Sequence, residues 1–250
     1  MSRAASFPRA AAAQTGVELR LTARRGENLL AMIGIPAALL LFFGATSVLP
    51  APASGTRVQA VLPGTLALAI IATGLVNLGI ATAFERSYGV LLRLGGSPLG
   101  RSGLITAKVA TVLVVELVLT GVLVALAAGV LGWRPADALS VPALLAAVIL
   151  GTATFAGFGL AMAGSLRAEA VLVLANVLFL VVMAIGGVLV PVAQLPGPVG
   201  ALAALLPPAA LTSVLAGALG GPAPDALAWL VLTVWAVVAV ALAIRTFRWD

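Results

Sequence analysis

The side chains that could carry out chemistry are few in this sequence. Histidine and cysteine are absent, and lysine occurs once, as Lys108. The chain therefore lacks imidazole bases, thiolate nucleophiles and Cys/His metal ligands. Lys108 stands in the run LITAKVA without the glycines of a phosphate-binding loop, so ATP hydrolysis through a Walker-type motif is excluded. The sequence also lacks an acidic cluster suited to Mg²⁺, and nothing in it supports an enzyme.

Three strongly polar side chains, Asn77, Glu116 and Asn176, lie inside long apolar stretches. A carboxylate in a spanning helix costs about 2.5–3.5 kcal/mol, so Glu116 must face protein or water or be protonated. A structural hydrogen bond to a neighbouring helix is the favoured role for Glu116, and a substrate or gating role is the alternative. For the two asparagines we expect hydrogen bonds between packed helices, with Glu116 as one candidate partner.

The composition indicates that these residues are positioned by helices in a bilayer. Apolar residues make up 62% of the chain and charged residues 9%, whereas soluble domains carry about 25% charged residues. So few charges could not cover a soluble surface, and a lipid environment explains the deficit. The sequence therefore predicts an all-α membrane protein with six transmembrane helices. These spans are expected near residues 29–49, 58–83, 104–132, 138–166, 170–190 and 225–245.

The basic residues set the orientation, because cytoplasmic loops are enriched in lysine and arginine. With six spans and the N-terminus inside, 12 of the 14 basic residues fall on the inner side, and only Arg57 and Arg134 fall outside. A seventh span through 199–220 would place Arg245 and Arg248 outside, so six spans are favoured. We predict a multi-pass protein of the plasma membrane with both termini cytoplasmic and no nucleic-acid partner.

The segment 16–28 precedes the first span and mixes apolar with charged side chains. Its basic residues are Arg20, Arg24 and Arg25. Two interpretations are equally open: an amphipathic helix lying on the inner membrane surface, or a basic flank that only fixes topology.

Two further segments differ from the main spans. Residues 1–15 are polar and small, and we predict a disordered cytoplasmic tail ahead of a single six-span domain at 16–250. Residues 199–220 are apolar but interrupted by Pro207 and Pro208. We interpret them as two short helices that pack at the outer surface or dip partway into the membrane.

A series of short motifs, in this order along the chain, resembles a known family. The motifs are ELRL at 18–21, RRGENLL at 24–30, GIP at 34–36, FER at 84–86, YGVL at 88–91, RLG at 93–95, SPL at 97–99, Lys108 followed by Glu116, and LPP at 206–208. Together they are similar to bacterial ATP-binding-cassette permeases of the type-2 exporter family, and especially to daunorubicin-resistance-like permeases.

The resemblance implies a six-span subunit that pairs with a second permease copy, as a homodimer or heterodimer. Separate ATPase subunits would dock from the cytoplasm and would hold ATP and Mg²⁺, while this chain would hold no cofactor. It also implies an amphipathic helix before the first span, a cytoplasmic coupling helix after the second, and short outer helices between spans five and six.

The loop at 84–103 is the only inner loop long enough to dock such a partner, and its first half is compatible with a short helix. It combines charges with an apolar face, so we favour contact with the ATPase over a solvated loop. The expected contact residues are Glu85, Arg86, Tyr88, Leu91, Leu92 and Arg93.

Export of a hydrophobic or amphipathic small molecule, a drug or a lipid, is the function that this resemblance favours. Aromatic residues make up only 5% of the chain. Sugar polymers are usually gripped by aromatic faces, so polysaccharide export is a less favoured alternative. The alternative from another class is a membrane assembly or regulatory protein, for example in cytochrome maturation or signal relay.

Overall fold

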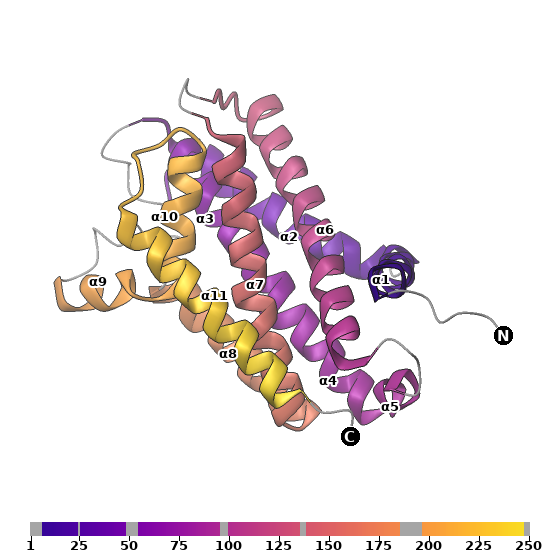
Figure 1. Cartoon of the computed structure of the whole chain (residues 1–250). Helices are drawn as coiled ribbons and strands as arrows, with labels where there is room; N and C mark the ends of the chain where they lie inside the picture. The colour runs from indigo at the N-terminus through magenta and orange to yellow at the C-terminus, as the bar shows by residue number, and fades with distance from the viewer. Residues whose placement is uncertain are drawn as a thin grey trace.

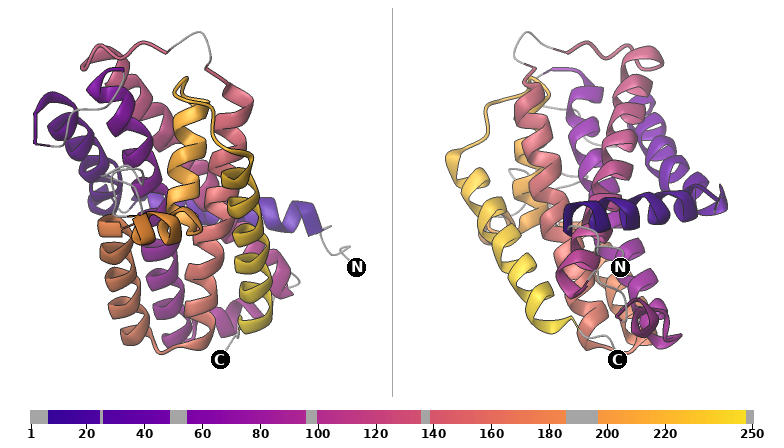
Figure 2. Two further views of the ribbon diagram at one scale, coloured as in Figure 1. Left: turned by 90° about the vertical axis from the view of Figure 1, so that its left-hand side faces the viewer. Right: turned by 45° about the vertical axis from the view of Figure 1, so that its right-hand side comes forward.

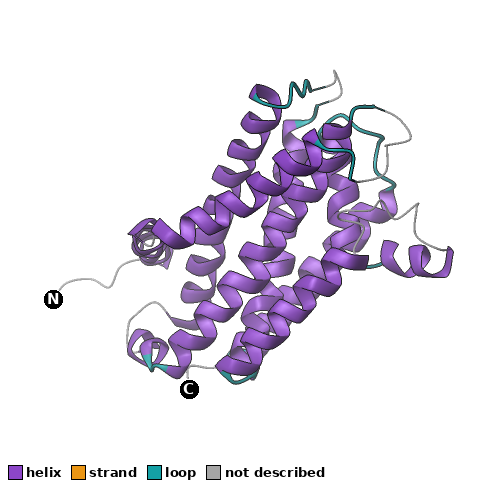
Figure 3. Cartoon of the chain, turned by 180° about the vertical axis from the view of Figure 1, so that it is seen from behind, coloured by secondary structure: helices purple, strands orange, loops and turns teal. Residues whose placement is uncertain are grey.

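The computed structural model describes residues 7–24, 26–48, 55–95, 100–135, 139–185 and 197–247 (Figure 1). Across these residues the regular secondary structure is helical, which confirms the all-α prediction (Figure 3). The elements are α1 (Phe7–Arg24), α2 (Gly26–Ala45), α3 (Arg57–Ile71), the π-helix η1 (Ala72–Leu78), α4 (Gly79–Ser87), α5 (Val90–Gly95), α6 (Gly100–Gly129), α7 (Val141–Ser165), α8 (Ala168–Ile185), α9 (Gly197–Ala204), α10 (Pro207–Ala218) and α11 (Ala226–Thr246).

Four helical stretches in the described ranges are long and apolar enough to cross a membrane. They are Arg57–Ser87, which joins α3, η1 and α4, Ser102–Gly129 in α6, Val141–Ser165, and Ala226–Thr246. The number rises to six if each of two bent pairs counts as one span: α1 with α2, bent by 72°, and α9 with α10, bent by 79°. The four stretches overlap four of the spans expected from the sequence. The chain is therefore a multi-pass membrane protein.

The helices define two ends of one bundle, which we name the α5 end and the far end. At the α5 end the last turn of α11 meets α7, where Thr246 Oγ1 donates to the carbonyl of Ala161 at 3.3 Å. At the far end the amide of Ser140 donates to the carbonyl of Ala218, the last residue of α10, at 2.9 Å. Helix α5 lies at the same end of the bundle as the C-terminal end of α11, since Leu91 and Phe247 belong to one buried cluster (Figure 2). Helix α8 begins at the α5 end of the bundle, and α10 ends at the far end.

Helix α7 lies at the centre of the bundle and approaches its neighbours closely through glycine. A Cβ built on Gly157 would lie 2.8 Å from the backbone of Ala239 in α11. One built on Gly159 would lie 2.5 Å from the carbonyl oxygen of Gly74 in η1. Small residues at helical spacing in a membrane helix favour such close packing.

We expect Gly159→Ala to lower the free energy of unfolding by about 1–3 kcal/mol, because the added methyl would force α7 away from η1. The matched control is Gly121→Ala in α6, where a Cβ would meet nothing within 4 Å. There alanine should be neutral or stabilising, since it favours helix over glycine by about 1 kcal/mol. Thermal unfolding of the two variants in detergent micelles measures both effects. Equal midpoints for Gly159→Ala and the unchanged protein would contradict the close approach.

The structure bears on two sequence-based expectations, one for the N-terminal tail and one for residues 199–220. Helix α1 begins at Phe7, so residues 7–15 are helical where a disordered tail was expected. The reason is the alanine run 10–13, since alanine has the highest helix propensity of any residue. The two short helices expected in residues 199–220 are present as α9 and α10, and the burial of α10 agrees with the alternative of a segment that dips inward. The side chains of α10 are buried from Pro207 to Leu211, and α10 packs among α3, α7 and α11.

Candidate functional site

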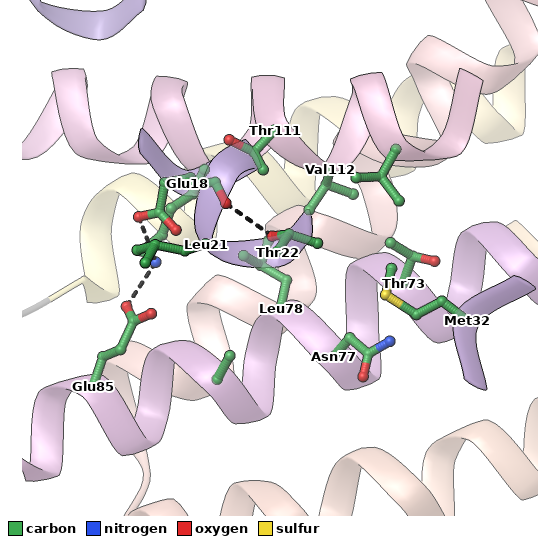
Figure 4. Close-up of a pocket in the computed structure, with 13 residues that line it drawn as sticks. Glu18, Leu21, Thr22, Met32, Thr73, Asn77, Leu78, Glu85, Thr111 and Val112 are labelled. Atoms are coloured by element: carbon green, nitrogen blue, oxygen red, sulfur yellow. Dashed lines mark hydrogen bonds and ion pairs between the residues drawn. The ribbon is translucent and has the colours of Figure 1, made fainter. Parts of the chain in front are cut away.

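A buried lysine joins three helices near the α5 end of the bundle (Figure 4). Lys108 of α6 is only 2% exposed. Its Nζ donates to Glu85 Oε2 of α4 at 2.7 Å and to Glu18 Oε1 of α1 at 3.3 Å. Gln14 Nε2 also donates to Glu18 Oε1, at 3.2 Å. We call Glu18, Glu85 and Lys108 the charge cluster. With all three ionised it carries a net charge of −1.

The face that α1 turns toward α6 places Glu18 in this cluster. Ala11, Thr15 and Glu18 follow one another at helical spacing, so they lie on the same side of α1. Ala11 is buried, and Thr15 Oγ1 lies 3.4 Å from the carbonyl oxygen of Ala107. Helix α1 therefore crosses α6 beside Lys108, and it runs across the long helices of the bundle (Figure 2). The charge cluster fixes this crossing.

Arg86 ties the end of α4 to a second neighbour. Its Nη2 donates to the carbonyl of Leu166, in the turn between α7 and α8, at 2.5 Å. Sequence analysis placed Glu85 and Arg86 at the start of a loop that docks a partner. In the structure both belong to α4, and the charged groups of both engage other parts of this protein. The reason is that α4 continues to Ser87. The Glu85 carboxylate therefore reaches the buried Lys108, and the Arg86 guanidinium reaches the carbonyl of Leu166.

Beyond α4 the chain turns at Gly89, whose φ of 71° suits glycine, and enters the short helix α5. Leu91 is fully buried against Leu104 and Phe247. By contrast, Tyr88 is 73% exposed and Leu92 is 57% exposed. The structure thus separates the expected apolar face: Leu91 anchors α5, and Tyr88 and Leu92 point away from the bundle.

The remaining basic residues of the expected sites are Arg20, Arg24, Arg25 and Arg93. Arg20 and Arg24 are exposed on α1. Arg25 lies outside the described residues, and Arg93 lies in α5. The exposed pair fits a helix that lies along a membrane surface, which stays a proposal.

Glu116 lies in the middle of α6 and is 1% exposed. Its Oε2 forms a hydrogen bond with the hydroxyl of Thr152 in α7, and that hydroxyl also lies 2.8 Å from the carbonyl oxygen of Val148. No hydrogen bond reaches Glu116 Oε1 from the described part of the chain. The carboxyl group therefore links α6 to α7 through one oxygen.

The two intramembrane asparagines behave differently from each other. Asn176 is exposed on α8, and its amide donates to the carbonyl of Leu172 one turn earlier at 2.7 Å, so it does not link two helices as expected. Asn77 lies in η1, half-buried, and no hydrogen bond of its side chain joins any described residue. Neither asparagine pairs with Glu116.

The described residues hold no group of three or more acidic, cysteine or histidine side chains that could bind a metal ion. The sequence lacks a phosphate-binding loop as well. The arrangement at the α5 end therefore suits mechanical linkage between helices, since it joins α1, α4 and α6 by ionic contacts and leaves Tyr88 and Leu92 exposed.

Sequence reasoning missed the charge cluster. It singled out Lys108 and Glu85 separately and placed Glu18 in a surface segment, because these residues are far apart along the chain. One signal was available: Lys108 is the only lysine and stands inside an apolar run. A buried cation requires an acidic partner, and only eight acidic residues exist to supply it.

The comparisons with known proteins agree with this architecture. The family model described as ABC-2 type transporter matches residues 13–219. No curated protein matches the chain.

Proposed function

We propose that this chain, which belongs to the ABC-2 type transporter family, exports a hydrophobic or amphipathic small molecule, a drug or a lipid. The match over residues 13–219 carries the proposal, because the family consists of membrane subunits of ATP-driven transporters. The low aromatic content supports the substrate class over a sugar polymer. The chain works with separate ATPase subunits, which bind ATP and Mg²⁺, and with a second permease copy.

The proposed layout has six spans with both termini in the cytoplasm. The split of 12 inner to 2 outer basic residues supports it. The shared location of α1 and the end of α11 near the α5 end supports it as well. Helix α6 has 30 residues and is roughly 45 Å long, whereas the hydrocarbon core is about 30 Å thick. That excess length is consistent with α5 standing in the cytoplasm.

The proposed mechanism transmits force from α5 to three other helices. Helix α5 follows α4 directly, and its exposed residues Tyr88 and Leu92 receive the ATPase. Lys108 then links the end of α4 to α1 and α6, and Arg86 links it to the turn between α7 and α8. A displacement of α5 therefore moves α1, α6 and α7 together, because packed helices move as rigid bodies.

Reconstitution into liposomes tests this function. The purified chain alone should hydrolyse no ATP. With an ABC ATPase subunit encoded beside it, ATP should be hydrolysed and a fluorescent amphiphile should move across the bilayer. Steady ATP hydrolysis by the chain alone would contradict the proposal that separate subunits hydrolyse ATP. An active ATPase complex that moves no amphiphile would favour a polymer substrate or a regulatory role instead.

A further inference from the structure

An apolar pocket lies in the corner between α1, α2 and α6, which contact one another pairwise. It has a volume of about 170 Å³, and it opens beside Val118, which is 58% exposed. Among the described residues that line it only Thr22 is polar, and the Thr22 hydroxyl donates to the carbonyl of Glu18 at 2.9 Å. An apolar cavity of about 150 Å³ stays dry and takes up a benzene-sized molecule. This pocket therefore suits a stretch of hydrocarbon chain rather than water.

In the proposed layout the pocket lies at the depth of lipid acyl chains. Helix α1 crosses α6 beside Lys108, and Val118 lies ten residues after Lys108, roughly 15 Å closer to the far end. The hydrocarbon core is about 30 Å thick, which corresponds to about 20 residues of helix. Counted back from Gly129, the last residue of α6, that length reaches to about position 110. The crossing of α1 then lies at the inner boundary of the hydrocarbon, and Val118 lies inside it.

A row of arginines adjoins the apolar lining on α1. Leu19 and Ala23 line the pocket one helical turn apart. Arg20 and Arg24 are also one turn apart, so the two rows run side by side along the helix. Both arginines are exposed, and no ion pair reaches either of them from the described residues. Residues 19–33 contain three arginines and a single glutamate. An anion beside this row would meet two guanidinium groups, and a chain attached to it would reach the pocket.

We propose that this corner binds one anionic phospholipid of the inner leaflet. The phosphate lies between Arg20 and Arg24, and one acyl chain passes over Ala23 into the pocket and ends against Val118. Basic side chains on a helix at the membrane surface attract anionic lipids, and the pocket selects one of these lipids by receiving its chain. The placement in the inner leaflet rests on the proposed layout. The binding itself requires neither the ATPase nor transport, so it can fail or succeed independently of the proposed function.

Saturable binding of radiolabelled phosphatidylglycerol to the full chain in dodecyl maltoside micelles tests the head-group contacts. One lipid per chain is expected. Arg20→Gln should weaken binding roughly fivefold, and Arg20→Gln with Arg24→Gln roughly 25-fold, because each arginine contributes separately to holding an anionic lipid. The matched control is Arg9→Gln, which removes an exposed arginine of the same helix. Arg9 lies eleven residues before Arg20, about 16 Å along the axis, so binding should stay unchanged.

Filling the pocket tests the position of the acyl chain. Val118→Trp fills it from α6 and Ala23→Leu fills it from α1, and both positions are exposed, so the fold should persist. Each variant should weaken binding at least tenfold, because burial of two methylene groups already contributes about that factor. The matched control is Val173→Trp on α8, where valine is 62% exposed. Thermal unfolding of each variant verifies that a loss of binding is not a loss of fold.

Three results would overturn the proposal. The first is binding that does not saturate. The second is equal displacement of the labelled lipid by phosphatidylcholine with the same acyl chains, since that lipid carries no net charge. The third is binding that falls in the arginine variants but persists in both pocket variants, because the lipid would then be attracted to the surface of α1 without entering the pocket.

Discussion

Replacing Lys108 with methionine is expected to lower the free energy of unfolding by about 3–5 kcal/mol, the usual result of removing one partner from a buried ion pair. Methionine matches the length and apolar stem of lysine but carries no charge. Glu18 and Glu85 would then face each other without the ammonium group that now lies 3.3 Å from one and 2.7 Å from the other. Their repulsion would separate α1 and α4 from α6. Thermal unfolding of the purified chain in micelles measures the loss.

Neutralising the whole charge cluster distinguishes repulsion between the two glutamates from a packing defect at position 108. Lys108→Met combined with Glu18→Gln and Glu85→Gln should recover most of the stability, because replacing a complete buried ionic group by neutral residues is often neutral or stabilising. Arg134→Met is the matched control, since Arg134 is an exposed basic residue outside the helices. If the single and triple variants are equally destabilised, the charges do not hold the three helices together.

The positions of most spans could be predicted because each depends on local composition. A long apolar run between basic flanks determines a membrane helix without reference to the rest of the fold. The close packing of α7 also depends on local composition, since small residues at helical spacing let helices approach closely. Gly157 and Gly159 do make such approaches, to α11 and to η1.

The charge cluster could not be predicted, because it depends on which helices become neighbours. Glu18 and Lys108 are 90 residues apart, and Glu85 and Lys108 are 23 apart. Each looks like an ordinary charge at the border of a span. The same limitation applies to α10. Its double proline marks the start of a short helix, but only the packed bundle shows that this helix is enclosed by α3, α7 and α11.

Substituting aspartate for both Tyr88 and Leu92 is expected to abolish docking of the ATPase while leaving the permease folded. The two side chains are 73% and 57% exposed, so removing them should cost little stability. At an interface, loss of one aromatic anchor typically costs about 2 kcal/mol, which is roughly a 30-fold loss of affinity. A buried aspartate would add a desolvation penalty. Co-purification with the ATPase subunit and ATP-driven transport in liposomes measure the effect.

The control for this pair is Val130→Asp, because Val130 is 64% exposed but lies at the far end of α6. It should retain docking. Leu91→Asp gives the opposite contrast: Leu91 is fully buried, so that variant should lose its fold. Undiminished co-purification of the Tyr88/Leu92 variant would place docking elsewhere on the chain.

Exchanging the charges of Glu85 and Arg86 then distinguishes docking of the ATPase from transmission of its movement to the other helices. Both heads are engaged inside the permease, Glu85 with Lys108 and Arg86 with the carbonyl of Leu166. The exchange would place an arginine beside the Lys108 ammonium and a carboxylate beside a carbonyl oxygen, and both contacts would become repulsive. Because Tyr88 and Leu92 remain in place, the ATPase should still bind, with transport lost and the permease destabilised. Loss of ATPase binding in a fully stable permease would show instead that these two charges form part of the docking surface.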